Sequence, residues 1–200
     1  MEKINDNKEE KKERVAIFID GSNFYHSVKK ILKPNERVDY EKLINLLVKN
    51  RDLVITYYYV TKLDENLDKK KYDKHQAYIE KLSKIEKFKI ILCGFKKIKQ
   101  MDGNYNYIVK GDDIYLAHDL LIGVFDNLYD TAIIVSGDED FLPLIQTIRV
   151  RFGKRVENAY FRASSSYKLR KSCNFSLRLN KIISKFVTDK VNTSSSAIRR

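Results

Sequence analysis

Two short and almost purely apolar runs constrain the fold of this chain more than any other feature of its sequence. They are Val15-Ala-Ile-Phe-Ile19 and Thr131-Ala-Ile-Ile-Val135. Both are too short for a core helix, and neither alternates apolar with polar residues as a half-exposed strand does. Both runs therefore predict strands that are buried on two faces, as the strands of a parallel sheet are.

Strand-like and helical patterns alternate along the rest of the chain. We expect strands at residues 14–20, 52–61, 88–95, 131–136 and 155–161, and a loop or hairpin at 96–109. We expect helices at 22–32 with Ser22 or Asn23 as the cap, after a cap at Asp39, at 67–87, 112–127 and 140–152, and in short pieces around 167–171 and 177–186. This alternation predicts an α/β fold in which helices flank a mainly parallel sheet of about five strands.

Length and composition favour one domain in a reducing compartment. Residues 14–187 are expected to form the domain, between a charged leader (1–13) without the apolar core of a signal peptide and a disordered basic and serine-rich tail (188–200). No apolar stretch approaches the ~18 residues of a membrane span. Cys93 and Cys173 are too few for a disulfide framework. We therefore expect a cytoplasmic protein with buried thiols and no membrane partner.

Aspartates follow the predicted strands at the positions where a parallel sheet gathers its ligands. Asp20 ends the first apolar run, Asp138 and Asp140 follow the second, and Asp113 stands at the start of a predicted helix. The carboxyl ends of parallel strands meet at one edge, so these carboxylates should lie together and repel one another. A divalent cation such as Mg²⁺ or Mn²⁺ would compensate this repulsion and could activate water against a phosphodiester. Asn23 adds an uncharged amide that can orient water or an Asp20 oxygen.

The formal net charge of +12 favours a polyanionic partner, because excess lysine and arginine attract phosphates. Biased codon usage, which raises the content of Lys, Asn, Ile and Tyr, is the alternative explanation. The segment 162–171 is the favoured contact because it follows the last predicted strand and is expected to border the acidic crevice. The residues expected to contact nucleic acid are Lys110, Arg162, Lys168, Arg170 and Lys171.

Asp119 and the histidines are not expected to bind metal. Asp119 lies about 120° around its helix from Asp113, which favours a surface or supporting role. His26, His75 and His118 are dispersed and have no ligand spacing to another histidine or cysteine. We expect these histidines to be solvated or packed on helix faces.

Three motifs carry a resemblance to a known family. Ile17-Phe-Ile-Asp-Gly-Ser-Asn23, Lys110-Gly-Asp-Asp113 and Ser136-Gly-Asp-Glu-Asp-Phe-Leu-Pro143 resemble the motifs of the NYN domain family (LabA-like, DUF88), which is placed with the PIN-like ribonucleases. The resemblance spans residues 14 to about 180 and implies a PIN-like three-layer sandwich.

The resemblance also implies an activity and a set of site residues. It implies an endoribonuclease that cleaves RNA with Mg²⁺ or Mn²⁺. The choice between RNA and single-stranded DNA stays open, and so does the oligomeric state, although PIN-like enzymes commonly form homodimers. The metal-binding acids would be Asp20, Asp113, Asp138 and Asp140, with Asn23 as the associated polar residue of the catalytic group. Two positions depart from the family pattern. Asp112 adds an acid beside the site, and Asn174 replaces an Asp found in many members.

Other interpretations of the sequence remain open. Each aspartate taken singly could be a helix cap or a turn residue. The domain could also be catalytically weak and serve to bind RNA or a regulatory partner. A phosphatase of the haloacid dehalogenase type would place Asp20 similarly, but that chemistry needs a second Asp where this chain has Ser22.

Overall fold

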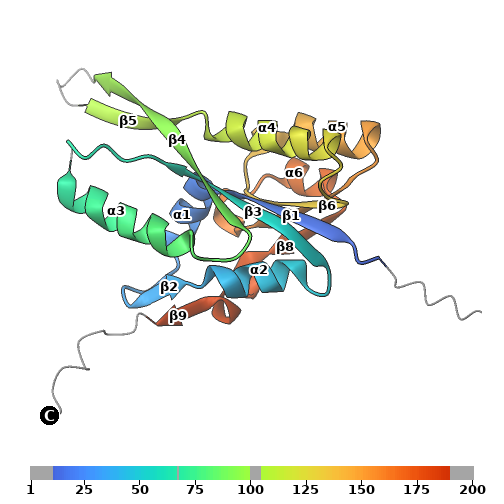
Figure 1. The fold of residues 1–200 in the computed structure, drawn as a ribbon, viewed down its shortest axis with the longest axis horizontal. Coiled ribbons are helices and arrows are strands. Elements are labelled where there is room, and N and C mark those ends of the chain that lie inside the picture. The colour runs from blue at the N-terminus through green and yellow to red at the C-terminus, as the bar shows by residue number, and fades with distance from the viewer. Residues whose placement is uncertain (1–10, 67, 100–104, 190–200) are drawn as a thin grey trace, which may run out of the picture.

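The protein has one twisted seven-stranded sheet, in the order β5-β4-β3-β1-β6-β7-β8 (Figure 1). The computed structural model describes residues 11–66, 68–99 and 105–189, and only the backbone of 95–99 and 105–110. The strands are β1 (Arg14–Asp20), β3 (Asp52–Thr61), β4 (Phe88–Lys99), β5 (Tyr105–Lys110), β6 (Thr131–Val135), β7 (Arg155–Tyr160) and β8 (Phe175–Arg178). All neighbouring strands are parallel except β4 and β5, which form an antiparallel hairpin.

Helices cover both faces of the sheet, which makes the fold a three-layer α/β sandwich (Figure 1). The first three are α1 (Gly21–Lys29), α2 (Tyr40–Val48) and α3 (Lys69–Leu82), and the last three are α4 (Asp112–Phe125), α5 (Leu142–Arg151) and α6 (Tyr167–Ser172). In β1, Ile17 and Ile19 pack in the core cluster of α1–α3, whereas Ala16 and Phe18 pack in that of α4–α6. The two-sided burial of this strand explains why it contains no polar alternation.

The sheet has more strands than the sequence predicted. The segment 96–109 is partly a hairpin, because β4 continues to Lys99 and pairs with β5. The short helical pieces expected at 177–186 are confirmed only in part: residues 175–178 form β8 beside β7, and two short 3-10 helices follow, η3 (Leu179–Lys181) and η4 (Ile183–Lys185). So short a segment has too few residues to distinguish helical from strand periodicity. Its state is decided by the free edge of β7.

A second small sheet ties the end of the described chain to its first third. It pairs β2 (Glu36–Val38) with β9 (Val187–Asp189) in antiparallel register. Order therefore extends into the segment that was expected to begin a tail at residue 188, whereas residues 190–200 and 1–10 lie outside the described residues. Because the two strands stand far apart in the sequence, no local pattern predicts that they pair. No helix in the described ranges is long and apolar enough to cross a bilayer.

The start of α1 corrects one expected cap. Asp20, rather than Ser22 or Asn23, caps the helix, because its Oδ1 accepts a hydrogen bond from Asn23 N at 2.9 Å. The helix consequently begins at Gly21 and ends at Lys29, three residues before the predicted end. The residue singled out as a ligand is therefore also part of a helix cap.

Strand order reverses beside β1, and this positions the site. From β1 the chain proceeds outward through β3, β4 and β5, then returns to β6 on the other side of β1. Ligands of open parallel sheets bind in the crevice at such a reversal, at the carboxyl ends of the strands. Asp20 ends β1 and Ser136 follows β6, so the predicted acidic motifs border this crevice.

Candidate metal and nucleic-acid site

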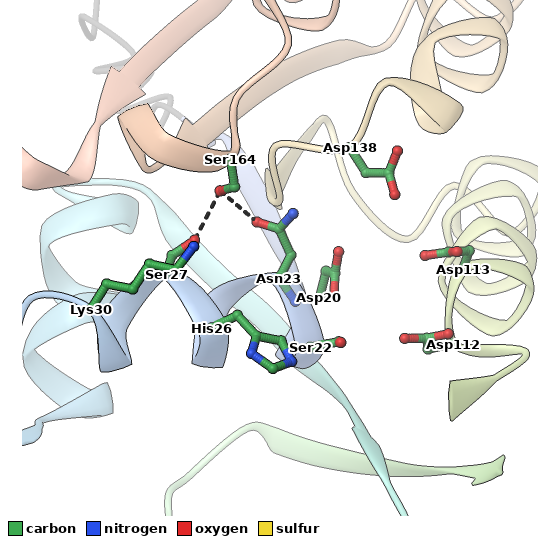
Figure 2. A pocket seen from close by; sticks show the side chains of 10 residues that line it. All are labelled: Asp20, Ser22, Asn23, His26, Ser27, Lys30, Asp112, Asp113, Asp138 and Ser164. Carbon is green, nitrogen blue, oxygen red and sulfur yellow. Dashed lines mark hydrogen bonds between the residues drawn. The ribbon is translucent and has the colours of Figure 1, made fainter. Parts of the chain in front are cut away.

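An open pocket of about 300 Å³ lies at the carboxyl ends of β1 and β6 (Figure 2). Carboxylates from three separate elements form one side, and α1 with the 3-10 helix η2 (Arg162–Ser164) forms the other. The lining residues are Asp20, Ser22, Asn23, His26, Ser27, Lys30, Asp112, Asp113, Asp138 and Ser164. Three of the predicted metal-binding acids, together with Asn23, thus border one pocket.

Asp20 is the most deeply buried of these acids, with 5% of its surface exposed. Its Oδ1 accepts a hydrogen bond from Asn23 N at 2.9 Å, and its Oδ2 accepts one from Ser136 Oγ at 2.8 Å. Burial raises the pKa of Asp20, the two hydrogen bonds oppose this rise, and the nearby Asp112 and Asp138 add to it. The carboxylate is therefore held rigidly in a place where negative charge is disfavoured.

The turn after β6 carries the next acids. Ser136 Oγ accepts a hydrogen bond from Asp138 N at 3.1 Å, and Asp138 Oδ1 accepts one from Asp140 N at 3.0 Å. Ser136 therefore both binds Asp20 and shapes the turn. Asp138 lines the pocket, whereas Asp140 is exposed and stands outside the lining.

The first turn of α4 delivers two acids from a third direction. Gly111 precedes it with a φ of +90°, a left-handed conformation that favours glycine. Asp112 and Asp113 follow at the positive end of the helix dipole. The pKa of Asp113 is raised to about 6, first by burial and then by repulsion from the other acids. Those acids are Asp112, Asp20, Asp138 and Asp140, so Asp140 acts on the site electrostatically from outside the lining.

The wall opposite the acids is uncharged or basic, and apart from Asn23 its residues were not recognised from the sequence. Asn23 Oδ1 accepts hydrogen bonds from Gly137 N at 3.2 Å and Ser164 Oγ at 3.1 Å, and the hydroxyls of Ser27 and Ser164 lie 2.8 Å apart. The side-chain oxygen of Asn23 thus binds the β6 turn and η2 rather than orienting Asp20. The amide nitrogen of Asn23 faces the pocket (Figure 2).

A helical spacing could have revealed part of this wall. Asn23, His26, Ser27 and Lys30 follow one another at steps of three, one and three, which places them on one face of α1. His26 and Lys30 are exposed at the pocket. His26 was expected to be solvated, and it is, but it also borders the pocket.

The acids fit a hard divalent cation in donor type and charge. Carboxylate oxygens are the ligands that Mg²⁺ and Mn²⁺ prefer. A bound cation would offset the negative charge of the neighbouring acids, which, after burial, raises the pKa of Asp113. Within the described residues, however, no three His, Cys, Asp or Glu side chains are grouped closely enough to hold an ion. Holding one would therefore require these side chains to move towards a common point.

The residues expected to contact nucleic acid take different positions. Arg162 is exposed in η2, which also contributes Ser164 to the pocket. Lys168 Nζ donates to Glu139 Oε1 at 2.7 Å, and Arg170 and Lys171 lie against tyrosine rings. The side chain of Lys110 lies outside the part of the structure that is described.

Asn174 and Asp119 both lie outside the pocket lining. Asn174 precedes β8 at the amino-terminal ends of the parallel strands, away from the pocket. Its Oδ1 accepts a hydrogen bond there from Val156 N at 2.9 Å. The absence of an Asp at this position therefore removes nothing from the acidic pocket. Asp119 Oδ2 accepts a hydrogen bond from the Tyr59 hydroxyl at 3.0 Å, which is the supporting role expected for it.

Comparison with known proteins identifies the family of the chain. The sequence matches the NYN domain over residues 14–179, most of its length. The chain belongs to the NYN domain family. This confirms the resemblance carried by the three motifs and agrees with a PIN-like fold, and it groups the chain with PIN-like nucleases. The haloacid dehalogenase interpretation is accordingly set aside.

One solved structure shares the fold of this chain. The structure of a protein of unknown function from Vibrio parahaemolyticus is similar with a TM-score of 0.63 and 23% sequence identity. The similarity covers 90% of this chain and 98% of that chain. At this identity the likeness concerns the fold alone. A comparison with curated proteins found no match.

Proposed function

We propose that this NYN domain is a metal-dependent nuclease, most specifically an endoribonuclease that hydrolyses RNA phosphodiester bonds. The observation that carries the proposal is the placement of Asp20, Asp138 and the Asp112–Asp113 pair around one open pocket from three separate elements. Burial, followed by repulsion from the neighbouring acids and Asp140, raises the pKa of Asp113 to about 6. Repulsion of this kind costs the fold stability, and acids whose pKa is shifted by burial and by neighbouring charges are typical of functional sites.

In this proposal the acidic wall of the pocket binds the cation, and the opposite wall contacts the water and the phosphate. Asp20, Asp113 and Asp138 would hold Mg²⁺ or Mn²⁺, with Asp140 adding charge at the rim. When bound, such an ion supplies an activated water and neutralises charge on the phosphate. The amide nitrogen of Asn23 can donate to that water or to a phosphate oxygen. His26 and Lys30 lie opposite the acids, where Lys30 would attract the phosphate backbone.

Exchange of the acids for their uncharged amides tests the proposal. Asp20→Asn and Asp138→Asn should each lower cleavage of labelled single-stranded RNA by about two to three orders of magnitude, the loss typical of a group that stabilises transition-state charge. Asp126→Asn is the matched control, because Asp126 is exposed at the far end of the same helix that carries Asp113. Full activity in both pocket variants would refute the assignment.

A binding domain without catalysis is the second candidate. The observation that favours it is the absence, within the described residues, of three acids grouped closely enough to hold an ion. It predicts salt-sensitive RNA binding without cleavage when Mg²⁺ or Mn²⁺ is supplied. Parallel assays on single-stranded DNA of the same sequence would show whether the 2′-hydroxyl is needed.

A further inference from the structure

Aromatic and basic side chains form a compact surface beside the acidic pocket, which we call the Tyr167 platform. It consists of Tyr160 at the end of β7 and of Tyr167, Arg170 and Lys171 on α6. The Arg170 guanidinium carbon lies 4.8 Å from the Tyr160 ring centroid and 5.7 Å from that of Tyr167. Lys171 Nζ lies 5.7 Å from the Tyr167 centroid. These separations are typical of cation–π contacts.

The platform is attached directly to the turn that carries the acids. Ser166 N donates to Gly137 O at 3.0 Å, and Ser166 Oγ donates to Glu139 Oε2 at 2.7 Å. Gly137 and Glu139 flank Asp138, and Tyr167 is the residue after Ser166. Tyr167 therefore begins a helix that is fixed at the border of the pocket.

The contacts of the basic side chains show which of them are exposed and have no carboxylate partner, and so could bind a phosphate. Arg170 is engaged by the two tyrosine rings, and its Nη1 donates to Ser165 Oγ at 2.6 Å and to Ser165 O at 3.3 Å. The charge of Lys168 is compensated by Glu139. In the described part of the chain, Lys171 and Arg162 are exposed and form no ion pair.

We propose that Tyr167 stacks on an unpaired base of single-stranded RNA next to the cleaved bond, while Lys171 neutralises the adjacent phosphate. Tyr167 is 64% exposed, which leaves room for a base to lie on its ring. Bases in a duplex have both faces covered by their neighbours, so a stacking platform selects unpaired strands. The inference rests on the proposed nuclease function, because it assigns that site a substrate class.

Binding measurements in an Asp138→Asn background with Mg²⁺ test the platform while the RNA stays intact. Tyr167→Ala should weaken binding of labelled single-stranded oligoadenylate about tenfold, since one base–aromatic stack is lost. Tyr167→Phe keeps the ring and should bind like the parent. Phe175→Ala is the matched control. Phe175 is likewise an exposed aromatic beside a cation, because its ring centroid lies 5.4 Å from Lys49 Nζ. It begins β8, at the amino-terminal ends of the parallel strands and away from the pocket.

Two further probes separate stacking from charge. Tyr167→Ala should leave the affinity for duplex RNA and for inorganic polyphosphate unchanged, because neither offers an unstacked base. Unweakened oligoadenylate binding, or an equal loss with polyphosphate, would overturn the platform. Cleavage by the otherwise wild-type chain reports on the nuclease separately. If the chain cleaves RNA but binding does not depend on Tyr167, the stacking proposal is wrong and the nuclease proposal stands. If binding depends on Tyr167 but no RNA is cleaved, the stacking role of Tyr167 stands and the nuclease proposal is wrong.

Discussion

At the scale of single residues, the site is defined by carboxylates that are held where their charge is unfavourable. Asp20 is buried with both oxygens hydrogen-bonded, and Asp113 is surrounded by four other acids. Residues chosen for fold stability alone would not be arranged in this way, because each ionised acid raises the free energy of the folded state. The change in folding stability when one of these carboxylates is removed is therefore a direct test of the site.

Asp113→Asn should stabilise the metal-free protein at neutral pH. The pKa of Asp113 is about 6 in the fold against an ordinary 3.8, so the folded state holds this proton more strongly than the unfolded state. Wild-type stability should thus fall as the pH rises from about 4 to about 6, and remain lower above that range. Thermal unfolding in EDTA should show the variant melting a few degrees higher at neutral pH, with no difference near pH 4.

Addition of Mg²⁺ should reverse this order. A ligand that binds only the folded state raises its melting temperature, so wild type should gain more from Mg²⁺ than Asp113→Asn does. Asp126→Asn should gain as much as wild type. A variant that melts below wild type in EDTA at neutral pH would contradict the repulsion assigned to Asp113.

At the scale of elements, the pocket depends on how closely the β6 turn packs on η2 and α6. A Cβ built on Gly137 would lie 1.7 Å from the carbonyl oxygen of Ser164. Gly137 also donates its N–H to Asn23 Oδ1 and accepts a hydrogen bond from Ser166 N. The glycine of this motif is therefore required for a close backbone approach rather than for an unusual φ.

Gly137→Ala should separate the turn from η2 and disturb Asp138 and Asn23 together. The expected loss is about 1–3 kcal/mol in the free energy of unfolding, as for other overpacked sites, measured by urea unfolding. RNA cleavage, assayed where the variant is still folded, should fall more than this loss of stability accounts for. Gly153→Asn is the control, because Gly153 has open space around it and a φ of +63° that Asn tolerates. Wild-type cleavage by the Gly137→Ala variant would show that this contact does not position the acids.

At the scale of the whole molecule, the net charge of +12 is combined with an acidic centre. The acids occupy the crevice. Among the exposed cations, Lys30 lines it, Arg162 stands in η2, which contributes Ser164 to the lining, and Lys171 stands on α6, the next helix along the chain. This arrangement would attract a phosphate backbone to the rim and leave the centre for cations.

RNA affinity should consequently fall steeply with salt. For a few phosphate contacts to a single strand we expect roughly a tenfold loss or more between about 50 and 200 mM salt, followed by fluorescence anisotropy. Arg162→Ala with Lys171→Ala should reduce the slope of log affinity against log salt by about one, whereas Tyr167→Ala should lower affinity without changing the slope. A slope that stays unchanged in the double variant would place the phosphate path elsewhere.

The buried strands, the alternation of helices and strands, and the acidic motifs at strand ends could all be predicted from the sequence. These are local features, because burial on two faces removes polar residues from a strand and a parallel sheet places strand ends together. Asp20, Asp113 and Asp138 could be found in this way. The edge strands β5 and β8 could be predicted only poorly, since their state depends on a neighbouring strand more than on their own residues.

The second wall of the pocket, apart from Asn23, and the Tyr167 platform became visible only once the elements were packed together. Ser27 and Asn23 meet Ser164 across 137 and 141 positions of sequence, and Glu139 meets Ser166 across 27. Asp140, although in the same motif as Asp138, proved to stand outside the pocket lining. Such placements depend on how separate elements pack against one another. The local sequence around each residue does not specify that packing.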